Sequence, residues 1–349
     1  MNENSSVLII YTGGTIGMMH NPITGALEPL DFNHLYKHLP VLENLKCRID
    51  TYSFDPVIDS SDMNPDFWIE LAEVIEKNYE SYDGFVVLHG TDTMAYSASV
   101  LSFMLENLNK PVVFTGSQLP IGMIRSDGRE NFITAVEIAT AYKDGTPIVP
   151  EVSICFENKL FRGNRTTKFN AEHFDAFLSG NYPPLAVVGV HIHFNENDIL
   201  KPNFKKLKVH KKLDTHIMIL KLFPGIHPQK VEEFLHIDGL KGVIMETFGT
   251  GNVPTDHRFL NVLGEAIKRG ILIYNVSQCK AGSVAQGLYK TSLALESMGV
   301  ISGADITTES AIAKMMFLFG QNYPREEICR LLSLPLRGEM SLTGQKISN

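Results

Sequence analysis

Short, almost continuous apolar runs alternate with longer segments of helical periodicity along most of the chain. The runs show little polar alternation, which is typical of parallel strands buried on both faces. We predict strands at 7–11, 84–89, 111–115, 152–156, 217–222, 243–246 and 271–275. We predict helices at 65–79, 93–108, 129–142, 228–235, 257–269, 307–318 and 325–332. Strands separated by helices indicate βαβ units and parallel sheets covered on both faces.

The pattern changes between about His191 and Asp214, where the chain becomes polar and rich in lysine. Residues 201–212 carry six lysines and little sustained apolar pattern. Such a segment is typical of an interdomain linker, and 349 residues are enough for two domains. We therefore predict a larger N-terminal α/β domain at 1–190, a linker at 191–213 and a smaller C-terminal α/β domain at 214–349.

Charge and cysteine pattern narrow the classes of partner. Acidic residues outnumber basic ones, 39 to 31, so we expect no nucleic-acid partner. The apolar run at 7–11 is too short for a signal peptide or a membrane span, so we expect a cytoplasmic protein with no membrane partner. The sequence has no CxxC pair, and His191 and His193 lack a third ligand at metal spacing, so we expect reduced thiols and no metal. The four cysteines are Cys47, Cys155, Cys279 and Cys329.

The first candidate motif, Thr-Gly-Gly-Thr-Ile-Gly at 12–17, follows the strand at 7–11. Its spacing matches neither the dinucleotide fingerprint nor the P-loop, so we expect no nucleotide cofactor. Glycine permits a close backbone approach and exposes N–H groups at the end of a strand. Beside the Thr15 hydroxyl, such donors can stabilise an oxyanion while the hydroxyl attacks a carbonyl. The alternative is that Thr15 only caps a helix.

A second motif, His89-Gly90-Thr91-Asp92-Thr93, ends the strand at 84–89. The carboxyl ends of parallel strands open onto the same crevice, so both motifs are expected to face one site. The Asp92 carboxylate is suited to bind the ammonium group of an amino acid. The alternative is that Asp92 or Thr93 caps the following helix.

Two further polar segments are candidates for the same site. The turn Asp59-Ser60-Ser61-Asp62-Met63 carries hydroxyls and amides that can hold a ligand's α-carboxylate, or it is only a turn. The segment Arg162-Gly163-Asn164-Arg165-Thr166-Thr167-Lys168 carries three cations. These cations can orient a substrate or activate a hydroxyl, or they can belong to a solvated loop.

Taken in order, these segments closely resemble the motifs of bacterial-type L-asparaginases, and most closely those of the cytoplasmic type I branch. The resemblance also includes Thr-Gly-Ser-Gln at 115–118 and covers nearly the whole chain. It implies a larger N-terminal domain of flavodoxin-like topology with a mainly parallel sheet, and a smaller Rossmann-like C-terminal domain. It also implies a homotetramer built from two intimate dimers, and hydrolysis of L-asparagine to L-aspartate and ammonia without a cofactor.

The resemblance implies chemical roles for four residues. Thr15 is the nucleophile that forms the acyl-enzyme. Thr91, Asp92 and Lys168 form a second polar triad, in which Thr91 helps to activate the attacking water or hydroxyl. Because a carboxylate favours the charged form of a nearby ammonium, we expect Lys168 to orient Thr91 electrostatically rather than to act as a base.

The resemblance also implies substrate contacts. Asp92 holds the ammonium group, and Ser60 and Ser61 hold the carboxylate. Ser117 lines the pocket near the side-chain amide. Asn252 matches an asparagine that reaches into the active site of a partner subunit, so the site is expected to need a dimer.

Two positions depart from the family pattern. Many members carry a tyrosine in the lid that helps to activate the nucleophile, but residues 23–29, which include Ala26, contain none. Tyr289 is a candidate substitute, or the base is a different group. Glu246 stands near the position where relatives with an allosteric asparagine site use an arginine. A carboxylate there would repel the asparagine carboxylate, which argues against allosteric control.

Two other classes of function remain open from the sequence. One is a glutaminase-asparaginase of mixed specificity, or the asparaginase-like subunit of a tRNA-dependent amidotransferase. Asparagine and glutamine differ by one methylene group, which is worth only about 1–3 kcal/mol in a binding pocket. The other is a catalytically silent amino-acid sensor on the same scaffold. The presence of Thr15, Thr91, Asp92 and Lys168 together favours an enzyme.

Overall fold

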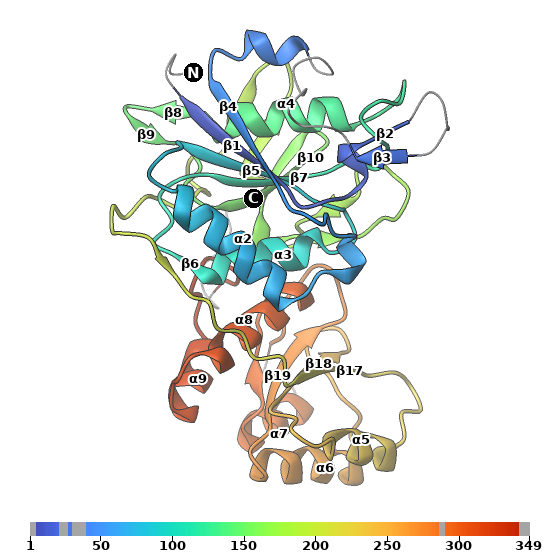
Figure 1. Cartoon of the computed structure of the whole chain (residues 1–349). Helices are drawn as coiled ribbons and strands as arrows, with labels where there is room; N and C mark the ends of the chain where they lie inside the picture. Colours follow the sequence, from blue (N-terminus) through green and yellow to red (C-terminus); the bar gives the residue numbers. More distant parts are fainter. Residues whose placement is uncertain (1–4, 21–26, 30–39, 286–289, 342–349) are drawn as a thin grey trace. The chain divides into compact units, whose positions relative to one another are not determined.

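The computed structural model describes residues 5–20, 27–29, 40–285 and 290–341 (Figure 1). The chain divides into two compact units. The first unit comprises Met1–Ser179 and Pro183–Lys211, and the second comprises Gly180–Tyr182 and Lys212–Asn349. Both units are α/β structures with parallel strands, as the alternation of strands and helices predicts.

Eight strands form the main sheet of the first unit. They are β1 (Ser6–Tyr11), β4 (Arg48–Ser53), β5 (Gly84–Leu88), β7 (Val112–Thr115), β10 (Val152–Phe156), β11 (Lys159–Arg162), β14 (Ala186–Val188) and β15 (Ile192–Phe194). Their order in the sheet is β15-β14-β11-β10-β7-β5-β1-β4. The last five strands of this order pair in parallel, whereas β11, β14 and β15 join as antiparallel strands. The parallel part has the flavodoxin-like order 2-1-3-4-5 when its strands are numbered along the chain.

This order creates a topological switch point between β1 and β5, where α/β proteins usually bind their ligands. The register aligns the ends of three neighbouring strands, because Tyr11 pairs with Leu88 and Leu88 pairs with Thr115. The loops that begin at Thr12, His89 and Gly116 therefore leave the same edge of the sheet. Each of these loops carries one of the motifs that the sequence singles out, at 12–17, 89–93 and 115–118.

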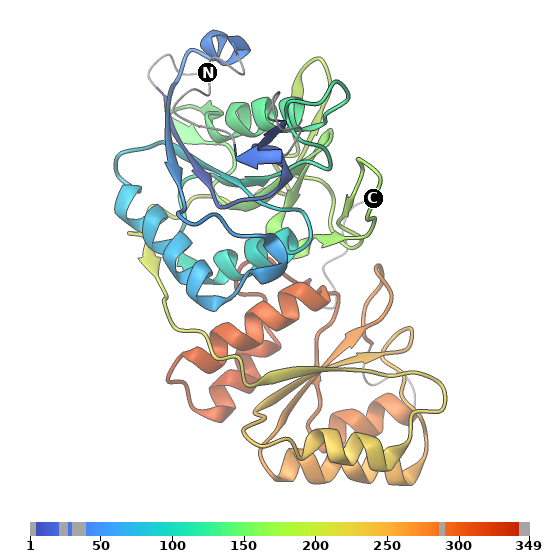
Figure 2. The same cartoon turned by 45° about the vertical axis from the view of Figure 1, so that its right-hand side comes forward.

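Helices cover both faces of this sheet. α2 (Pro65–Asn78) and α3 (Met94–Met104) lie on one face, and α4 (Gly128–Ala139) lies on the other (Figures 1 and 2). The Asn64 side chain caps α2, and Trp68 is buried. The short elements of this unit are β2 (Met18–His20), β3 (Leu27–Pro29), β6 (Leu105–Glu106), β8 (Tyr142–Lys143), β9 (Thr146–Pro147), β12 (Thr167–Lys168), β13 (Phe177–Leu178), β16 (Lys208–Val209), η1 (Thr15–Gly17), η3 (Pro40–Asn44), η4 (Ser60–Asp62) and η5 (Gly163–Arg165).

The lysine-rich segment differs from its prediction. Residues 191–211 belong to the first unit rather than to a separate linker. β15 extends the main sheet, and β16 pairs with β6. The same pairing explains why α3 ends at Met104 rather than at the predicted Leu108, since Leu105 and Glu106 are used in the β6–β16 ladder.

The second unit is a four-stranded parallel sheet with helices around it. Its strands, in sheet order, are β17 (Ile217–Lys221), β18 (Gly242–Thr247), β19 (Leu272–Ser277) and β20 (Ile301–Ser302). Its helices are α5 (Pro228–Leu235), α6 (His257–Lys268), α7 (Lys290–Met298), α8 (Thr308–Gly320) and α9 (Arg325–Leu332). An apolar core joins β18 and β19 to α5 and α6, with Val243, Met245 and Ile273 facing Val231 and Leu263.

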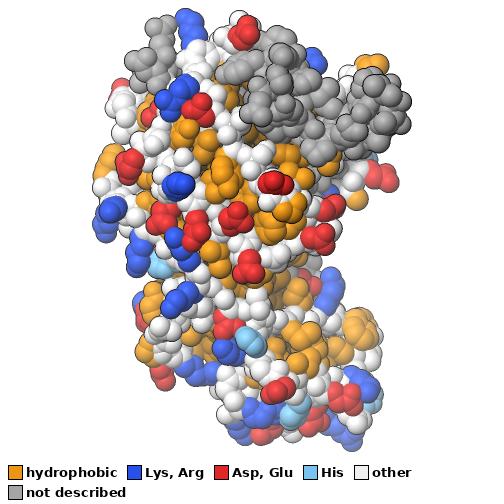
Figure 3. Space-filling view, in the orientation of Figure 1, with side chains coloured by type: hydrophobic (Ala, Val, Ile, Leu, Met, Phe, Trp, Pro, Cys, Tyr) orange, Lys and Arg blue, Asp and Glu red, His pale blue; other side chains and the backbone are white. Residues whose placement is uncertain are grey.

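The surface is of mixed character. Acidic, basic and apolar side chains are interspersed over the face seen in Figure 3. No helix in the part of the chain that the structure describes has both the length and the apolar character needed to cross a bilayer.

A fully buried ion pair stabilises the end of the second unit. Lys314 Nζ, on α8, lies 2.7 Å from Glu339 Oε1, and neither side chain is exposed. The ammonium also donates to the carbonyls of Leu332 and Leu334, while the carboxylate accepts from the N–H groups of Leu336 and Arg337. This pair ties the segment after α9 to the body of the unit.

We expect Lys314→Met to destabilise the second unit by about 3–5 kcal/mol, because it leaves the Glu339 carboxylate buried without a cation. The free energy of unfolding can be measured in urea by the fluorescence or circular dichroism of the whole chain. Lys268→Met is the matched control, because its exposed pair with Glu265 should contribute no more than about 1 kcal/mol. Equal urea midpoints of unfolding for Lys314→Met and Lys268→Met would contradict a stabilising role of the buried Lys314–Glu339 pair.

Candidate active site

A pocket of about 360 Å³ lies at the switch point of the first unit. It is formed by the loop after β1, the turn before α2 and the loop after β5. Its lining consists of Gly14, Thr15, Met18, Val57, Ile58, Asp59, Ser60, Gly90, Thr91 and Asp92. Residues from three of the predicted motifs therefore share one cavity.

Two glycines let the loop after β1 pack against its neighbours. Gly13 and Gly14 have φ values of 139° and 90°, which side chains rarely tolerate. A Cβ on Gly13 would lie 2.0 Å from the carbonyl oxygen of Ile58, and one on Gly14 would lie 2.5 Å from the Gly90 nitrogen. Glycine is thus required for the close backbone approach that the sequence predicts. It brings the Thr15 side chain, at the start of η1, into the pocket wall.

The Tyr11 side chain packs against this loop and stabilises it. Its buried phenol donates to the Gly14 carbonyl at 3.3 Å, and its ring fills the space that a side chain on Gly17 would need. Burial raises the pKa of Tyr11 to about 12, so the phenol remains a donor at neutral pH. Among the described residues, none forms a hydrogen bond with the Thr15 hydroxyl, and the predicted helix-cap role falls to Gly14.

The structure brings Thr91, Asp92 and Lys168 together from segments far apart in the sequence. Lys168 Nζ, on β12, donates to Thr91 Oγ1 at 2.8 Å and to Asp92 Oδ1 at 2.6 Å. The Lys168 side chain is 16% exposed and that of Asp92 is 67% exposed, so the pair lies at the pocket mouth. At the start of α3, Thr93 makes no side-chain cap; its hydroxyl donates to the Ser60 carbonyl at 2.6 Å.

The turn before α2 places Asp59 and Ser60 in the pocket wall. The Asp59 carboxylate accepts from the Ser61 N–H and the Ser61 hydroxyl, each at 2.8 Å, and these bonds lower the pKa of Asp59. Ser60 is buried, and its hydroxyl oxygen would lie 2.5 Å from a Cβ on Gly90. Ser61 is exposed and its hydroxyl is already bonded to Asp59. This segment is therefore more than a solvent-facing turn.

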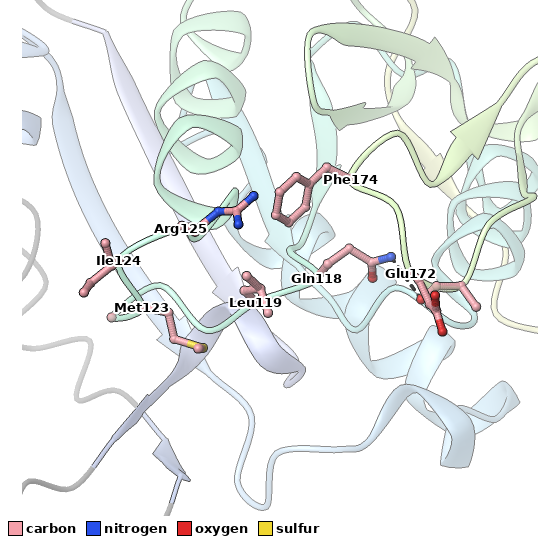
Figure 4. A pocket seen from close by; sticks show the side chains of 9 residues that line it. Gln118, Leu119, Met123, Ile124, Arg125, Glu172 and Phe174 are labelled. Atoms are coloured by element: carbon pink, nitrogen blue, oxygen red, sulfur yellow. Dashed lines mark hydrogen bonds between the residues drawn. The ribbon is translucent and has the colours of Figure 1, made fainter.

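Thr91, Asp92 and Lys168 form a polar cluster. In the Thr-Gly-Ser-Gln motif, the side chain that reaches this cluster is that of Gln118, for which the motif predicted no role. Gln118 Oε1 accepts from Thr91 Oγ1 at 3.3 Å, and its Nε2 donates to the carbonyls of Ala171 and His173. Ser117 is buried, and its hydroxyl donates to the Leu119 carbonyl at 2.6 Å. Gln118 also lines a second pocket, of about 780 Å³, in which Figure 4 shows it directed toward the 171–174 loop.

The three cations of the segment 162–168 have different environments. Arg162 is buried and forms an ion pair of 2.6 Å with Glu151, whose carboxylate also accepts from the Leu200 N–H. Arg165 is 2% exposed. Lys168 contacts Thr91 and Asp92, whereas both arginines are buried, so the prediction of a solvated loop is wrong for the two arginines.

The remaining predicted residues lie in the second unit or outside the described chain. Asn252 is partly exposed and forms an isolated β-bridge with Phe248. The Glu246 carboxylate is largely buried; it accepts from Thr308 Oγ1 at 2.6 Å and lies 3.3 Å from Lys221 Nζ. Tyr289 and residues 23–26 of the lid, including Ala26, lie outside the described residues.

The geometry suits covalent catalysis without a metal ligand set. The Thr15 side chain lines the same cavity as a second threonine, Thr91, whose hydroxyl accepts from the Lys168 ammonium, and this ammonium is itself paired with the Asp92 carboxylate. Within the described residues, no group of three His, Cys, Asp or Glu side chains is placed to hold a metal ion.

Comparison with known proteins matches both units. The family model described as "Asparaginase, N-terminal" covers residues 6–200, and that described as "Glutaminase/Asparaginase C-terminal domain" covers residues 216–332. The chain is 42% identical to L-asparaginase 1 of Escherichia coli (strain K12), over 97% of this chain and 99% of that protein. It is also 42% identical to the 60 kDa lysophospholipase of Mus musculus, over 98% of this chain and 64% of that protein.

A solved structure gives the same result. The crystal structure of L-asparaginase I from Vibrio cholerae O1 biovar eltor str. N16961 has a TM-score of 0.87 and 40% sequence identity. The match covers 97% of this chain and 100% of that one. The flavodoxin-like sheet, the switch-point pocket and two full-length matches agree, and the chain belongs to the asparaginase family.

Proposed function

We propose that this protein hydrolyses L-asparagine to L-aspartate and ammonia through an acyl-enzyme on Thr15. The observation that carries this proposal is the single pocket that Thr15 shares with Thr91 and Asp92, with Lys168 bonded to both. One hydroxyl is available for covalent attack, and the second is held by a cation. The 42% identity to a full-length L-asparaginase supports the choice of substrate.

In the proposed reaction, Thr15 Oγ attacks the carbon of the side-chain amide and gives its proton to a base. The tetrahedral intermediate collapses, the C–N bond breaks, and ammonia leaves with an added proton. Water then attacks the ester carbon, supported by the Thr91 hydroxyl, and releases aspartate while Thr15 regains its proton. We assign the stabilisation of the oxyanion in both intermediates to backbone N–H groups of the loops that follow β1 and β5.

The pocket also offers charge for both ends of an amino acid. The Asp92 carboxylate, paired with Lys168 on one oxygen, retains acceptor capacity for the substrate ammonium. We propose that the Ser60 hydroxyl holds the α-carboxylate, and that the Ser61 hydroxyl and N–H join it when the substrate carboxylate replaces Asp59 as their acceptor. Ser117 shapes the pocket through its loop, since its own hydroxyl is bonded to Leu119.

We also propose a cytoplasmic homotetramer built from two intimate dimers, in which the partner subunit's Asn252 completes each site. The support is the family resemblance and the partial exposure of Asn252. We propose that neither a cofactor, a nucleic acid nor a membrane takes part. The anionic Glu246, held by Thr308 and Lys221, does not favour an allosteric site for the asparagine carboxylate.

The proposed function is tested by ammonia release from L-asparagine and L-glutamine over a range of concentrations. We expect asparagine to be preferred by about tenfold or more in kcat/KM, because one extra methylene is worth about 1–3 kcal/mol in a fitted pocket. Comparable values for the two amides would instead identify a glutaminase-asparaginase. Because one relative is named a lysophospholipase, release of fatty acid from lysophosphatidylcholine should be measured as well. A protein that releases neither ammonia from the amides nor fatty acid from this ester would favour the silent sensor.

A further inference from the structure

A chain of buried hydrogen bonds runs beneath the pocket and ends at its floor. Trp68 Nε1, on α2, donates to Ser97 Oγ at 2.8 Å, and Ser97 Oγ lies 2.8 Å from His89 Nε2. His89 Nδ1 in turn lies 2.6 Å from the carbonyl oxygen of Gly90. His89 and Ser97 are fully buried and Trp68 is 6% exposed. None of these three side chains is used in the proposed reaction.

The chemistry of the two ends fixes every proton in this chain. The Gly90 carbonyl can only accept, so His89 Nδ1 must carry a hydrogen. Burial lowers the pKa of His89 to about 4, so the ring is neutral at neutral pH and Nε2 is an acceptor. Ser97 therefore donates to Nε2, and its oxygen accepts from the indole of Trp68, which can only donate. These hydrogen bonds favour the tautomer of neutral His89 that carries its hydrogen on Nδ1.

This hydrogen bond also fixes the orientation of a peptide group in the pocket wall. A trans peptide is planar, so its carbonyl and its N–H point in opposite directions. The carbonyl of Gly90 is directed to the buried His89 ring, and the N–H of Thr91 is therefore directed away from it. Gly90 is also packed closely against Ser60, since an added Cβ on Gly90 would lie 2.5 Å from the Ser60 hydroxyl oxygen. Among the described residues, the Thr91 N–H donates to no protein acceptor.

We propose that His89 is a positioning residue, which holds the Gly90–Thr91 peptide so that the Thr91 N–H faces the reacting carbonyl as an oxyanion donor. This inference rests on the proposed amide hydrolysis, and it assigns a task to a residue that does not touch the substrate. The role explains why a histidine stands at the end of β5. An apolar side chain would leave the Gly90 carbonyl without its buried donor.

The test compares two amide side chains at position 89. In His89→Asn, the side-chain nitrogen can occupy the place of Nδ1 and still donate to Gly90. In His89→Gln, the side-chain oxygen can occupy the place of Nε2 and accept from Ser97, so Ser97 keeps its acceptor but Gly90 loses its donor. We expect kcat to fall about tenfold in His89→Gln and no more than about threefold in His89→Asn. Complete loss of an oxyanion donor lowers kcat by about 10²–10³-fold, and a donor that is present but wrongly oriented should lower kcat by less.

The effect should appear in kcat, with KM changing by no more than about twofold. An oxyanion donor acts on charge that develops only in the transition state, whereas general damage to the site would also weaken substrate binding. His210→Gln is the matched control, because His210 is another buried histidine of the same unit, bonded to Glu106. We expect its kcat to be unchanged.

Ser97→Ala provides a second line of evidence if His89→Gln does not fold. It removes the donor to Nε2, so the tautomer with a hydrogen on Nε2 becomes accessible, and kcat should fall about threefold. The ¹⁵N chemical shifts of His89 should report the Nδ1-protonated tautomer in the unmodified protein and a mixture in Ser97→Ala.

The role of His89 is overturned if the wild type is active and the kcat values of His89→Gln and Ser97→Ala both lie within twofold of the wild-type value. It is also overturned if Asn and Gln at position 89 are equally impaired. A wild type that releases no ammonia would overturn the proposed function itself, and this inference with it.

Discussion

Replacing Thr15 by alanine is expected to reduce kcat for asparagine hydrolysis by roughly 10⁴-fold or more, as in other enzymes that lose a covalent nucleophile. The glycine turn holds Thr15 in the pocket wall at the end of β1, whereas Thr12 is buried and donates to the Leu88 carbonyl. The N–H groups and charged residues of the site remain in Thr15→Ala. Binding of L-aspartate, measured by calorimetry, should therefore change little while turnover is lost.

Thr15→Ser is the matched control for this prediction. It restores a hydroxyl without the methyl group, so kcat should recover to within about tenfold of the wild type. Mass spectrometry after rapid acid quenching should detect an acyl adduct on residue 15 in the wild type and in Thr15→Ser. It should detect none in Thr15→Ala. Turnover above 1% of the wild type in Thr15→Ala would show that another group carries the attack.

Both the location and much of the content of the site follow from the sequence. The apolar runs that end at Tyr11 and His89 are buried strands, and parallel pairing brings their carboxyl ends to one edge. Hydroxyl-bearing residues directly after such strands are expected to face a crevice, and the pocket contains Thr15 and Thr91. Four of the five parallel strands are predicted because they are short, almost continuously apolar runs, whereas β4 has mostly exposed polar side chains and is not predicted.

The antiparallel part of the sheet gives no comparable signal. β14 and β15 have three residues each and include exposed side chains, so neither hydrophobic period is expressed over their length. A polar segment with many lysines then resembles a linker, although β15 and β16 both pair with the first unit. Pairing of such short strands is decided by their neighbours, which a local pattern does not contain.

The direction of individual side chains in loops is similarly hidden. In the Thr-Gly-Ser-Gln motif, backbone geometry turns Ser117 toward Leu119 and directs Gln118 toward Thr91. Arginine is usually a surface residue, but Arg162 is buried because Glu151, eleven positions earlier in the chain, pairs with its charge in the interior. His89 could have been noticed, because a histidine that ends a buried strand needs partners for two ring nitrogens.

Replacing Lys168 by methionine is expected to lower kcat by about 10²–10³-fold while the protein stays folded. Lys168 Nζ is 2.8 Å from Thr91 Oγ1, so its charge orients this hydroxyl and stabilises negative charge that develops on it. The Asp92 side chain is 67% exposed and can be hydrated once the ammonium is removed. Because a pair of this exposure contributes little to folding, the free energy of unfolding should change by no more than about 1 kcal/mol.

Lys143→Met is the matched control, since Lys143 forms an exposed pair with Glu196 in the same unit and should leave kcat unchanged. Lys168→Arg keeps the charge but presents a planar fork in place of a compact ammonium, so its kcat should lie between those of the wild type and Lys168→Met. Near-normal turnover in Lys168→Met would exclude an essential role. If Lys168 acts through Thr91, then Lys168→Met should cost far less in a Thr91→Val background than in the wild type, because residues that work as a unit are not additive. Equal losses in the two backgrounds would show that Lys168 acts on the substrate or on Asp92 independently of Thr91.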